Sequence, residues 1–240
     1  MYVITEMSAD DAEWAAELME LKRQAYERYS PVFWRPATNV TAAHARYLRA
    51  VIVAPTTIAL RERDGFIICQ LRETEGFADD FTVAEPGAWH RTGAALLLAA
   101  AERLAAAGVH AVRVVTANAD RRKSGMLASL SLRLAEQWWV RELTPAEQAT
   151  SQEPGKVCGP GFAGWLGPAP GVYNPGGPVF QADPAKGYDS PEVIERAAAG
   201  LGAVLAVVPA APGTRAADEL DRAGWSVASD WYTGWPRPNR

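Results

Sequence analysis

The sequence predicts a mixed α/β fold in which one structural unit occurs twice, the second copy being shorter. Residues Ala111–Val115 align with Val204–Val208 without a gap at an offset of 93 positions. At the same offset, Trp138–Trp139 aligns with Trp231–Tyr232. Each copy has the pattern of a helix, a buried strand, a second helix and an aromatic strand. This duplication suggests two related lobes of class α/β (α+β), each with a mixed sheet.

Hydrophobic periodicity and turn residues predict the elements of the first 140 residues in the order β-α-α-β-β-β-α-β-α-β. Ser8 and Thr41 are expected to cap the first two helices, and Gly108 to end the third. Asp64–Gly65 predicts a hairpin turn. The expected strands are 3–6, 56–62, 66–72, 77–83, 112–116 and 132–140, and the expected helices are 8–29, 41–50, 92–107 and 121–130.

The remainder of the chain divides at a segment rich in proline and glycine. Residues 145–178 predict a connector with turns rather than a core of their own. After it, strands at 179–182, 204–208 and 226–232 alternate with helices near 191–199 and 215–223. The sequence therefore predicts an N-terminal domain at 1–144, a connector at 145–178 and a C-terminal half-domain at 179–240.

Composition excludes several classes of function. The net charge of -4 predicts no nucleic-acid partner, because binding of phosphates needs a basic surface. Cys69 and Cys158 are too few and too far apart for a zinc site or a disulfide framework, so no metal is expected. Met1–Met7 is not expected to be a signal peptide, and the apolar run Thr92–Ala107 is too short to span a membrane. We expect a cytoplasmic protein without a membrane partner.

One motif points to a family. An acidic pair opens Asp79–Val83, Gly93 follows Val83 at a fixed distance, and Ala94–Leu97 continues as a helix. With the order of elements, this pattern resembles the GNAT superfamily of acyl-CoA-dependent N-acyltransferases over residues 1–143. The C-terminal repeat resembles a second, truncated GNAT-like lobe. The resemblance implies transfer of an acetyl or short acyl group from acetyl-CoA to a primary amine of a small molecule or peptide, by a monomer or homodimer.

The resemblance also implies roles for residues. Asp79 or Asp80 would take the proton of the amine, directly or through water, and the family position favours Asp79. Because side chains alternate along a strand, at most one of the two is expected to face the cleft. The strand would pair with the pantetheine arm of the cofactor, and a helix start would face its pyrophosphate. The cofactor-binding candidates are Phe81, Thr82, Val83, Arg91, Thr92, Gly93, Ala94 and Lys123, and the substrate-binding candidates are Phe33 and Trp34.

The sequence departs from the family pattern at the helix start and at the leaving-group acid. Ala88 stands where arginine or glutamine is usual, and Arg91 replaces the first glycine of the loop. The Arg91 guanidinium would either contact phosphate or block the close backbone approach that glycine allows. Leu127 holds the position of the tyrosine that often protonates the leaving thiolate, so this acid is unassigned.

Several features have a plain structural interpretation beside the functional one. Arg121–Lys123 is either a solvated helix face or a set of contacts to the cofactor phosphates, and Phe33–Trp34 is either a packed loop or part of the acceptor cleft. His44, His90 and His110 have no partner motif and are expected to be surface or satisfied residues. The competing function is a non-catalytic binding module that kept the fold and lost the cofactor site. The C-terminal lobe has no acidic pair and is expected to be structural.

Overall fold

The computed structural model describes residues 3–149 and 153–235, and these form two compact units. Unit 1 contains the described residues of Met1–Ala25, Asn39–Ala135 and Trp231–Arg240. Unit 2 contains Tyr26–Thr38 and the described residues of Glu136–Asp230. One helix and two long strands begin in one unit and end in the other.

Unit 1 has the elements that the sequence predicts, with two differences. The strand expected at 77–83 is divided in two, and the helix expected from residue 92 begins at residue 94, after two short helical segments. The helical elements are η1 (Ala9–Asp11), α1 (Ala12–Tyr29), α2 (Val40–Ile52), η2 (Pro86–Ala88), η3 (Trp89–Gly93), α3 (Ala94–Ala106) and α4 (Arg121–Ser129). The strands are β1 (Thr5–Glu6), β2 (Thr57–Glu62), β3 (Gly65–Arg72), β4 (Glu75–Ala78), β5 (Phe81–Val83) and β6 (Ala111–Ala117).

The cap predicted for α2 at Thr41 was wrong. Asn39, at φ 58°, occupies the N-cap position, because asparagine tolerates the left-handed conformation that this turn requires. Thr41 lies inside the helix, and its hydroxyl donates a hydrogen bond of 3.3 Å to the Glu20 carboxylate. At the start of α4, Asp120 is the N-cap residue, and its side chain accepts a hydrogen bond from the Lys123 backbone N–H.

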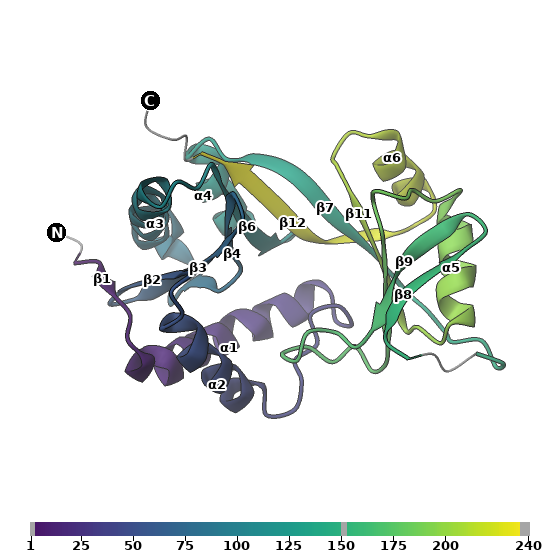
Figure 1. Cartoon of the computed structure of the whole chain (residues 1–240), viewed down its shortest axis with the longest axis horizontal. Helices are drawn as coiled ribbons and strands as arrows, with labels where there is room; N and C mark the ends of the chain where they lie inside the picture. Colours follow the sequence, from purple (N-terminus) through teal and green to yellow (C-terminus); the bar gives the residue numbers. More distant parts are fainter. Residues whose placement is uncertain (1–2, 150–152, 236–240) are drawn as a thin grey trace. The chain divides into compact units, whose positions relative to one another are not determined.

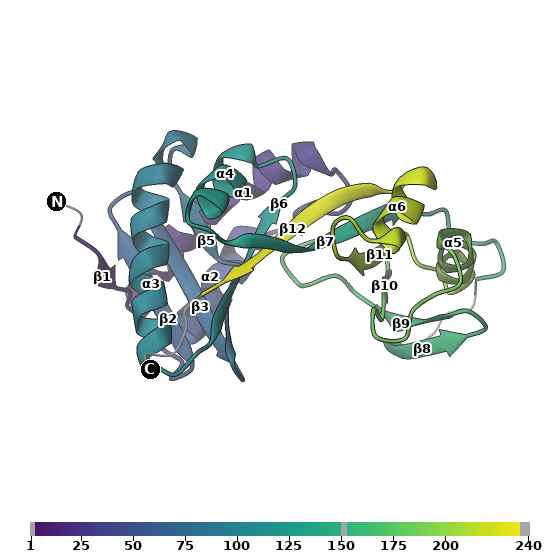
Figure 2. The same cartoon turned by 90° about the horizontal axis from the view of Figure 1, so that it is seen from above.

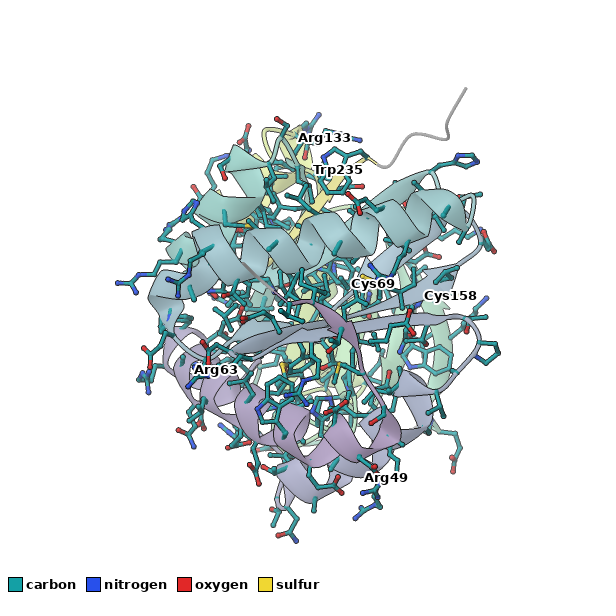
Figure 3. The ribbon with its side chains drawn as sticks, turned by 90° about the vertical axis from the view of Figure 1, so that its left-hand side faces the viewer. Arg49, Arg63, Cys69, Arg133, Cys158 and Trp235 are labelled. Carbon is teal, nitrogen blue, oxygen red and sulfur yellow. The ribbon has the colours of Figure 1, made fainter. Side chains whose placement is uncertain are left out.

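The sheet of unit 1 has the strand order β1-β2-β3-β4-β6, with β5 also paired to β3. The pairs are antiparallel except that β4 and β6 are parallel. Helices α1 and α2 cover one face, where Leu48 packs on Phe66 and its neighbours, and α3 covers the other (Figure 1). Figure 3 shows Cys69 inside this layered structure and Arg49 pointing outward from α2.

Unit 2 is a second α/β layer with more strands than the sequence predicts. Its strand order is β12-β7-β11-β10-β9-β8, and β10 and β11 are parallel (Figure 2). Strands β8 and β9 form an antiparallel hairpin inside the segment expected to be a connector, so that expectation was wrong for this part. The elements are β7 (Arg133–Glu142), β8 (Gly155–Gly159), β9 (Phe162–Gly167), β10 (Val179–Ala182), α5 (Pro191–Gly200), β11 (Leu205–Ala210), α6 (Arg215–Arg222) and β12 (Ser226–Gly234).

The structure confirms the internal duplication. The order of elements β6-α4-β7 is repeated as β11-α6-β12. Helix α4 ends at Ser129 and α6 ends at Arg222, and β7 begins at Arg133 and β12 at Ser226, so both pairs keep the offset of 93 residues that the sequence shows.

Close packing of β9 against β10 makes a glycine necessary in the hairpin of unit 2. A Cβ atom on Gly164 would lie 2.3 Å from the Gln181 carbonyl oxygen and 2.6 Å from the Phe180 ring. The carbonyl is backbone in the paired strand and has no room to move. Only glycine therefore allows this strand to lie so close to its neighbour.

Gly164→Ala should destabilise the protein by about 1–3 kcal/mol, since the added methyl overpacks a site bounded by backbone. Urea unfolding followed by tryptophan fluorescence measures the change. Gly171→Ala is the matched control, because nothing lies within 4 Å of its Cβ position. Equal midpoints for the two variants would contradict the packing described for β9 and β10.

Candidate functional site

A one-residue bulge separates β4 from β5. On β4, Phe77 pairs with Gln70 of β3, whereas on β5 Phe81 pairs with Ile67. The number of residues between these pairs is larger by one on the β4–β5 side, so the extra residue lies at Ala78–Asp79. The bulge breaks the strand at the acidic pair and places Asp79 and Asp80 in the break.

Beyond the bulge, one backbone edge of β5 has no partner strand in the described part of the chain, although the Phe81 N–H donates to the Asp79 carbonyl at 2.9 Å. The Ile68 N–H donates to the Asp80 carbonyl at 2.8 Å, and the Ala84 N–H donates to the Asp64 carbonyl at 2.7 Å. In an antiparallel pair these orientations alternate, so the N–H and C=O groups of Phe81 and Val83 point away from β3. The pairing of β4 with β6 ends at Ala78 and Val114, and in the described part of the chain β5 pairs with β3 alone.

The Lys123 side chain bridges the point where β5 and β6 separate. Its ammonium donates to the Val115 carbonyl at 2.7 Å and to the Phe81 carbonyl at 3.2 Å. It also lies 5.0 Å from the centre of the Phe81 ring and 5.2 Å from that of Trp89, within range of cation–π attraction. The residue is fully buried. Burial lowers the pKa of Lys123 well below its usual range, and the nearby charge of Lys22 lowers that pKa further.

A second lysine reaches the same carbonyl from α1. The Lys22 ammonium donates to the Phe81 carbonyl at 3.4 Å and to the Asp79 carbonyl at 3.3 Å. Unlike Lys123, this side chain is only partly buried. Burial lowers the pKa of Lys22, and the carboxylates of Asp79 and Asp80 partly oppose that shift. Two lysine side chains therefore meet at the break in the strand, next to the two carboxylates.

The Asp80 carboxylate is held from α2 and α1. Its Oδ1 lies 3.0 Å from His44 Nε2, and His44 Nδ1 lies 2.5 Å from an Arg23 Nη atom. A guanidinium can only donate, so Nδ1 accepts and the ring proton is on Nε2, where it donates to Asp80. His44 is buried and satisfied, as one of its two interpretations predicted. It thus links Asp80 to a fully buried cation.

The two aspartates have opposite pKa shifts. Burial and the neighbouring charge of Asp80 raise the pKa of Asp79, although Lys22 and Lys123 oppose the shift. Burial alone would raise the pKa of Asp80, but the hydrogen bond from His44 and the charges of Lys22 and Arg23 outweigh it, so this pKa is lowered. The pair therefore shares its first proton mainly on Asp79. The Asp79 side chain retains contact with solvent, so it is the carboxylate that a ligand can reach.

The expected phosphate-binding helix start is built differently from the family pattern. The chain turns through η2 and a π-type segment, η3, before α3 begins. Trp89 is buried with its ring edge on Phe81, at 5.0 Å between ring centres. A Cβ atom on Gly93 would lie 2.6 Å from the Trp89 ring. The glycine therefore makes room for an indole, a role different from the close phosphate approach that the resemblance implies.

The other predicted site residues are divided between the two units. Arg91 is exposed, whereas Thr92 is buried and its hydroxyl has no hydrogen-bond partner among the described residues. In unit 2, Trp34 is buried, and its indole N–H donates to the Ala228 carbonyl at 3.2 Å. Phe33 packs edge-on against Trp138 at 6.3 Å between ring centres. These contacts favour the packed-loop interpretation of Phe33 and Trp34.

Sequence reasoning missed Lys22, Arg23, His44 and Trp89 as parts of this site. Lys123 was expected near the phosphates or on a solvated face, but its ammonium instead fills the space between two strands. Cys69 is buried, and burial raises its pKa to about 12, so it is no nucleophile at neutral pH. Among residues 3–149 and 153–235, no group of three or more His, Cys, Asp or Glu side chains could hold a metal ion.

Lys123→Met should remove a pH dependence from the free energy of unfolding. Between the lowered folded pKa and the unfolded value of about 10.4, the unfolded chain binds a proton at Lys123 that the folded chain lacks. In that window the unfolding free energy of the unchanged protein should therefore rise relative to Lys123→Met, by about 1.4 kcal/mol for each pH unit. Urea titrations from pH 7 to pH 10 measure it. Exposed Lys156→Met is the control, and a difference that is independent of pH would refute the burial of Lys123.

Gly93→Ala should lower the unfolding free energy by about 1–3 kcal/mol, because its methyl group would displace the Trp89 ring. Gly87→Ala, in the same turn, has nothing within 4 Å of its Cβ position and should change stability by less than about 0.5 kcal/mol. Thermal unfolding of both variants tests the difference. An unchanged midpoint for Gly93→Ala would show that the indole does not occupy this position.

Comparisons with known proteins agree on the fold. No family model matches the sequence, and no curated protein sequence matches it. Among solved structures, a GCN5-related N-acetyltransferase from Sphaerobacter thermophilus aligns with a TM-score of 0.63 at 11% identity, covering 100% of this chain and 97% of that one. A tandem GNAT protein from the clavulanic acid biosynthesis pathway aligns with a TM-score of 0.54 at 13% identity, covering 100% of both chains.

None of the helices in the described residues has the length and apolar character needed to cross a membrane.

At 11–13% identity, the likeness to these two solved structures concerns the arrangement of the backbone. This likeness agrees with the order of elements, with the duplication and with the end-to-end alignment to a tandem protein. The chain therefore has the fold of the GNAT acetyltransferases, extended by a second, smaller GNAT-like lobe.

Proposed function

We propose that the chain transfers an acetyl or short acyl group from acyl-CoA to a primary amine. One observation carries this proposal: the outward-facing edge of β5 begins beside a solvent-accessible carboxylate, Asp79. An extended donor that adds to this edge, as a peptide adds to a sheet, would place its reactive end near the bulge. The edge continues toward η2 and α3, where helical N–H groups and the exposed Arg91 would face the phosphates.

Asp79 is the group that would remove the proton from the attacking amine. A general base works best when its pKa is near the working pH, and the pKa of Asp79 is raised toward that range. Asp80 would act as a positioning residue, because its carboxylate is already held by His44. Attack would be direct: Cys69 is buried with a pKa of about 12, so no thiol of unit 1 would carry the acyl group.

A second function is favoured by Lys123. Its ammonium is bound to the Phe81 carbonyl, on the edge that the donor would use. Together with Ala88 and Arg91 at the helix start, this contact favours a non-catalytic binding module that kept the GNAT fold. The two functions differ in one measurable property, which is the affinity of the protein for CoA.

Calorimetric titration with acetyl-CoA and with CoA decides between them. A transferase should bind in the micromolar range, about −8 kcal/mol. Arg91→Gly should weaken this binding if the guanidinium contacts phosphate, and strengthen it if the side chain obstructs the backbone. The absence of both heat and thermal stabilisation at millimolar ligand would reject the transferase.

Asp79→Asn should lower kcat/KM for an identified amine by about 10²–10⁴-fold, because the carboxylate that takes the proton is gone. Affinity for acetyl-CoA should be unchanged. Asp80→Asn should reduce activity less but lower the unfolding free energy more, because a neutral amide replaces the charged carboxylate that accepts from His44. Exposed Asp10→Asn is the control. Steady-state kinetics with a free-thiol assay measures all three, and unchanged turnover in Asp79→Asn would rule this residue out as the base.

A further inference from the structure

The face of the sheet that α1 and α2 cover extends beyond these helices along β3. Phe66 and Ile68 of β3 are buried under the two helices. Because side chains alternate along a strand, Gln70 and Arg72 point to the same face. Gln70 is partly exposed, and Arg72 is exposed. The helical layer on this face therefore ends before β3 does, and the last side chains of the strand meet solvent.

A series of contacts joins Arg72 to the acidic pair. His44, which holds Asp80, stacks on the Tyr47 ring at 5.9 Å between ring centres. The Gln70 side-chain amide donates to the Tyr47 hydroxyl at 2.6 Å. An Arg72 Nη atom in turn donates to the Gln70 side-chain carbonyl at 3.2 Å. The Arg72 guanidinium is therefore held in a defined place relative to the carboxylates.

The positive charge of Arg72 is not matched by a carboxylate of the protein. Glu75 lies directly opposite Arg72 in the ladder between β3 and β4, but its carboxylate pairs with Arg113 at 3.4 Å. The Arg72 guanidinium lies instead over the Phe77 ring, 4.2 Å from its centre. Among residues 3–149 and 153–235, no carboxylate forms an ion pair with Arg72. A guanidinium held by one amide and one ring keeps most of its N–H donors available for an anion.

Tyr47 lies within electrostatic range of both the guanidinium and the carboxylates. Burial raises the pKa of Tyr47, although the hydrogen bond from Gln70 opposes the shift. The charges of Asp80 and Asp79 raise this pKa further, and the charge of Arg72 lowers it. Because such effects weaken with distance, Tyr47 is close to groups of both signs. A ligand that lies across Tyr47 would therefore meet a cation at one end and a carboxylate at the other.

The length of β3 sets the size of such a ligand. The Ile68 N–H binds the Asp80 carbonyl, and Arg72 is four residues further along the strand. At about 3.3 Å per residue, this separation is about 13 Å between backbone positions. The side chains at the two ends shorten it, so charged groups about 10 Å apart would fit, the length of roughly three extended residues. The amine and carboxylate of a single α-amino acid lie too close together to reach both ends.

We propose that the acceptor is an extended amine with a distant carboxylate, such as a short peptide, whose amine lies at Asp79 and whose carboxylate binds Arg72. This names the acceptor class and rests on the proposed function for the reaction at the amine. A C–N bond forms at the peptide amine, the thioester C–S bond breaks, and the proton that the amine loses balances the one that the thiolate gains. Arg72 determines specificity, because a guanidinium binds a carboxylate through two parallel hydrogen bonds and a neutral amide more weakly.

Equilibrium titration with trialanine and with trialanine amide, with and without CoA, tests the site apart from any reaction. The two probes have the same amine and the same length, and they differ in the charge at the far end. Trialanine should bind at least about ten-fold more tightly than its amide. Arg72→Gln should abolish this preference, and the control Arg63→Gln should retain it, because Arg63 is exposed and pairs with Asp64 in its own turn. Equal affinities, or no binding of either probe at millimolar concentration in both conditions, would overturn the inference.

Steady-state kinetics with acetyl-CoA separates this inference from the proposed function. Arg72→Gln should raise KM for trialanine at least about ten-fold and leave kcat unchanged, because the lost contact serves binding and not proton transfer. Thermal unfolding checks that the variant is folded. Transfer to trialanine and to its amide with equal kcat/KM would overturn the inference alone. Selective binding of trialanine without any transfer supports the peptide site and rejects the transferase.

Discussion

The bulge at Ala78–Asp79 is the constraint on which the rest of the site depends. Pairing of β4 with β6 ends there, so β5 continues with one partner, β3, and leaves one backbone edge outward. Phe81 pairs with Ile67 of β3, and its carbonyl points to the edge that has no partner strand. Two lysines from different helices reach that carbonyl, and two adjacent carboxylates lie beside them. The chemistry of the site thus follows from a change of register.

Charge balance at the break explains why the two aspartates differ. Asp80 is fixed by His44, whose other ring nitrogen is held by buried Arg23, so its negative charge is stabilised in place. Within the described residues Asp79 has no such chain of donors, and the charges of Lys22 and Lys123, with a smaller contribution from His44, oppose its protonation. Adjacent carboxylates cannot both ionise easily, and the one with the weaker support takes the proton first. Two neighbouring residues of the same type therefore acquire separate functions from their surroundings.

The sequence predicts the regular parts of this molecule and misses the parts made by distant contacts. The Asp64–Gly65 hairpin, the acidic pair and the duplication can be seen in local pattern and spacing, and the structure contains them. The burial of Lys123 cannot be seen, because Arg121–Lys123 has the composition of a solvated helix start. The contact of His44 likewise cannot be predicted from the sequence, because only the packing of α2 places this residue beside Asp80. The strands β8 and β9 are missed because glycine and proline interrupt the alternation of apolar and polar residues by which a strand is predicted.

The second lobe shows why the duplicated fold does not duplicate the site. Strand β10 pairs in parallel with β11, as β4 pairs with β6. The residue after β10 is Asp183, but its carboxylate accepts a hydrogen bond of 2.9 Å from the Ala185 N–H and stabilises its own turn. Pro184 follows it in the sequence, so a single acid used in a turn stands where the first lobe has a carboxylate pair. The same backbone order thus supports a candidate site in one lobe and packing in the other, since function depends on the residues placed at the break.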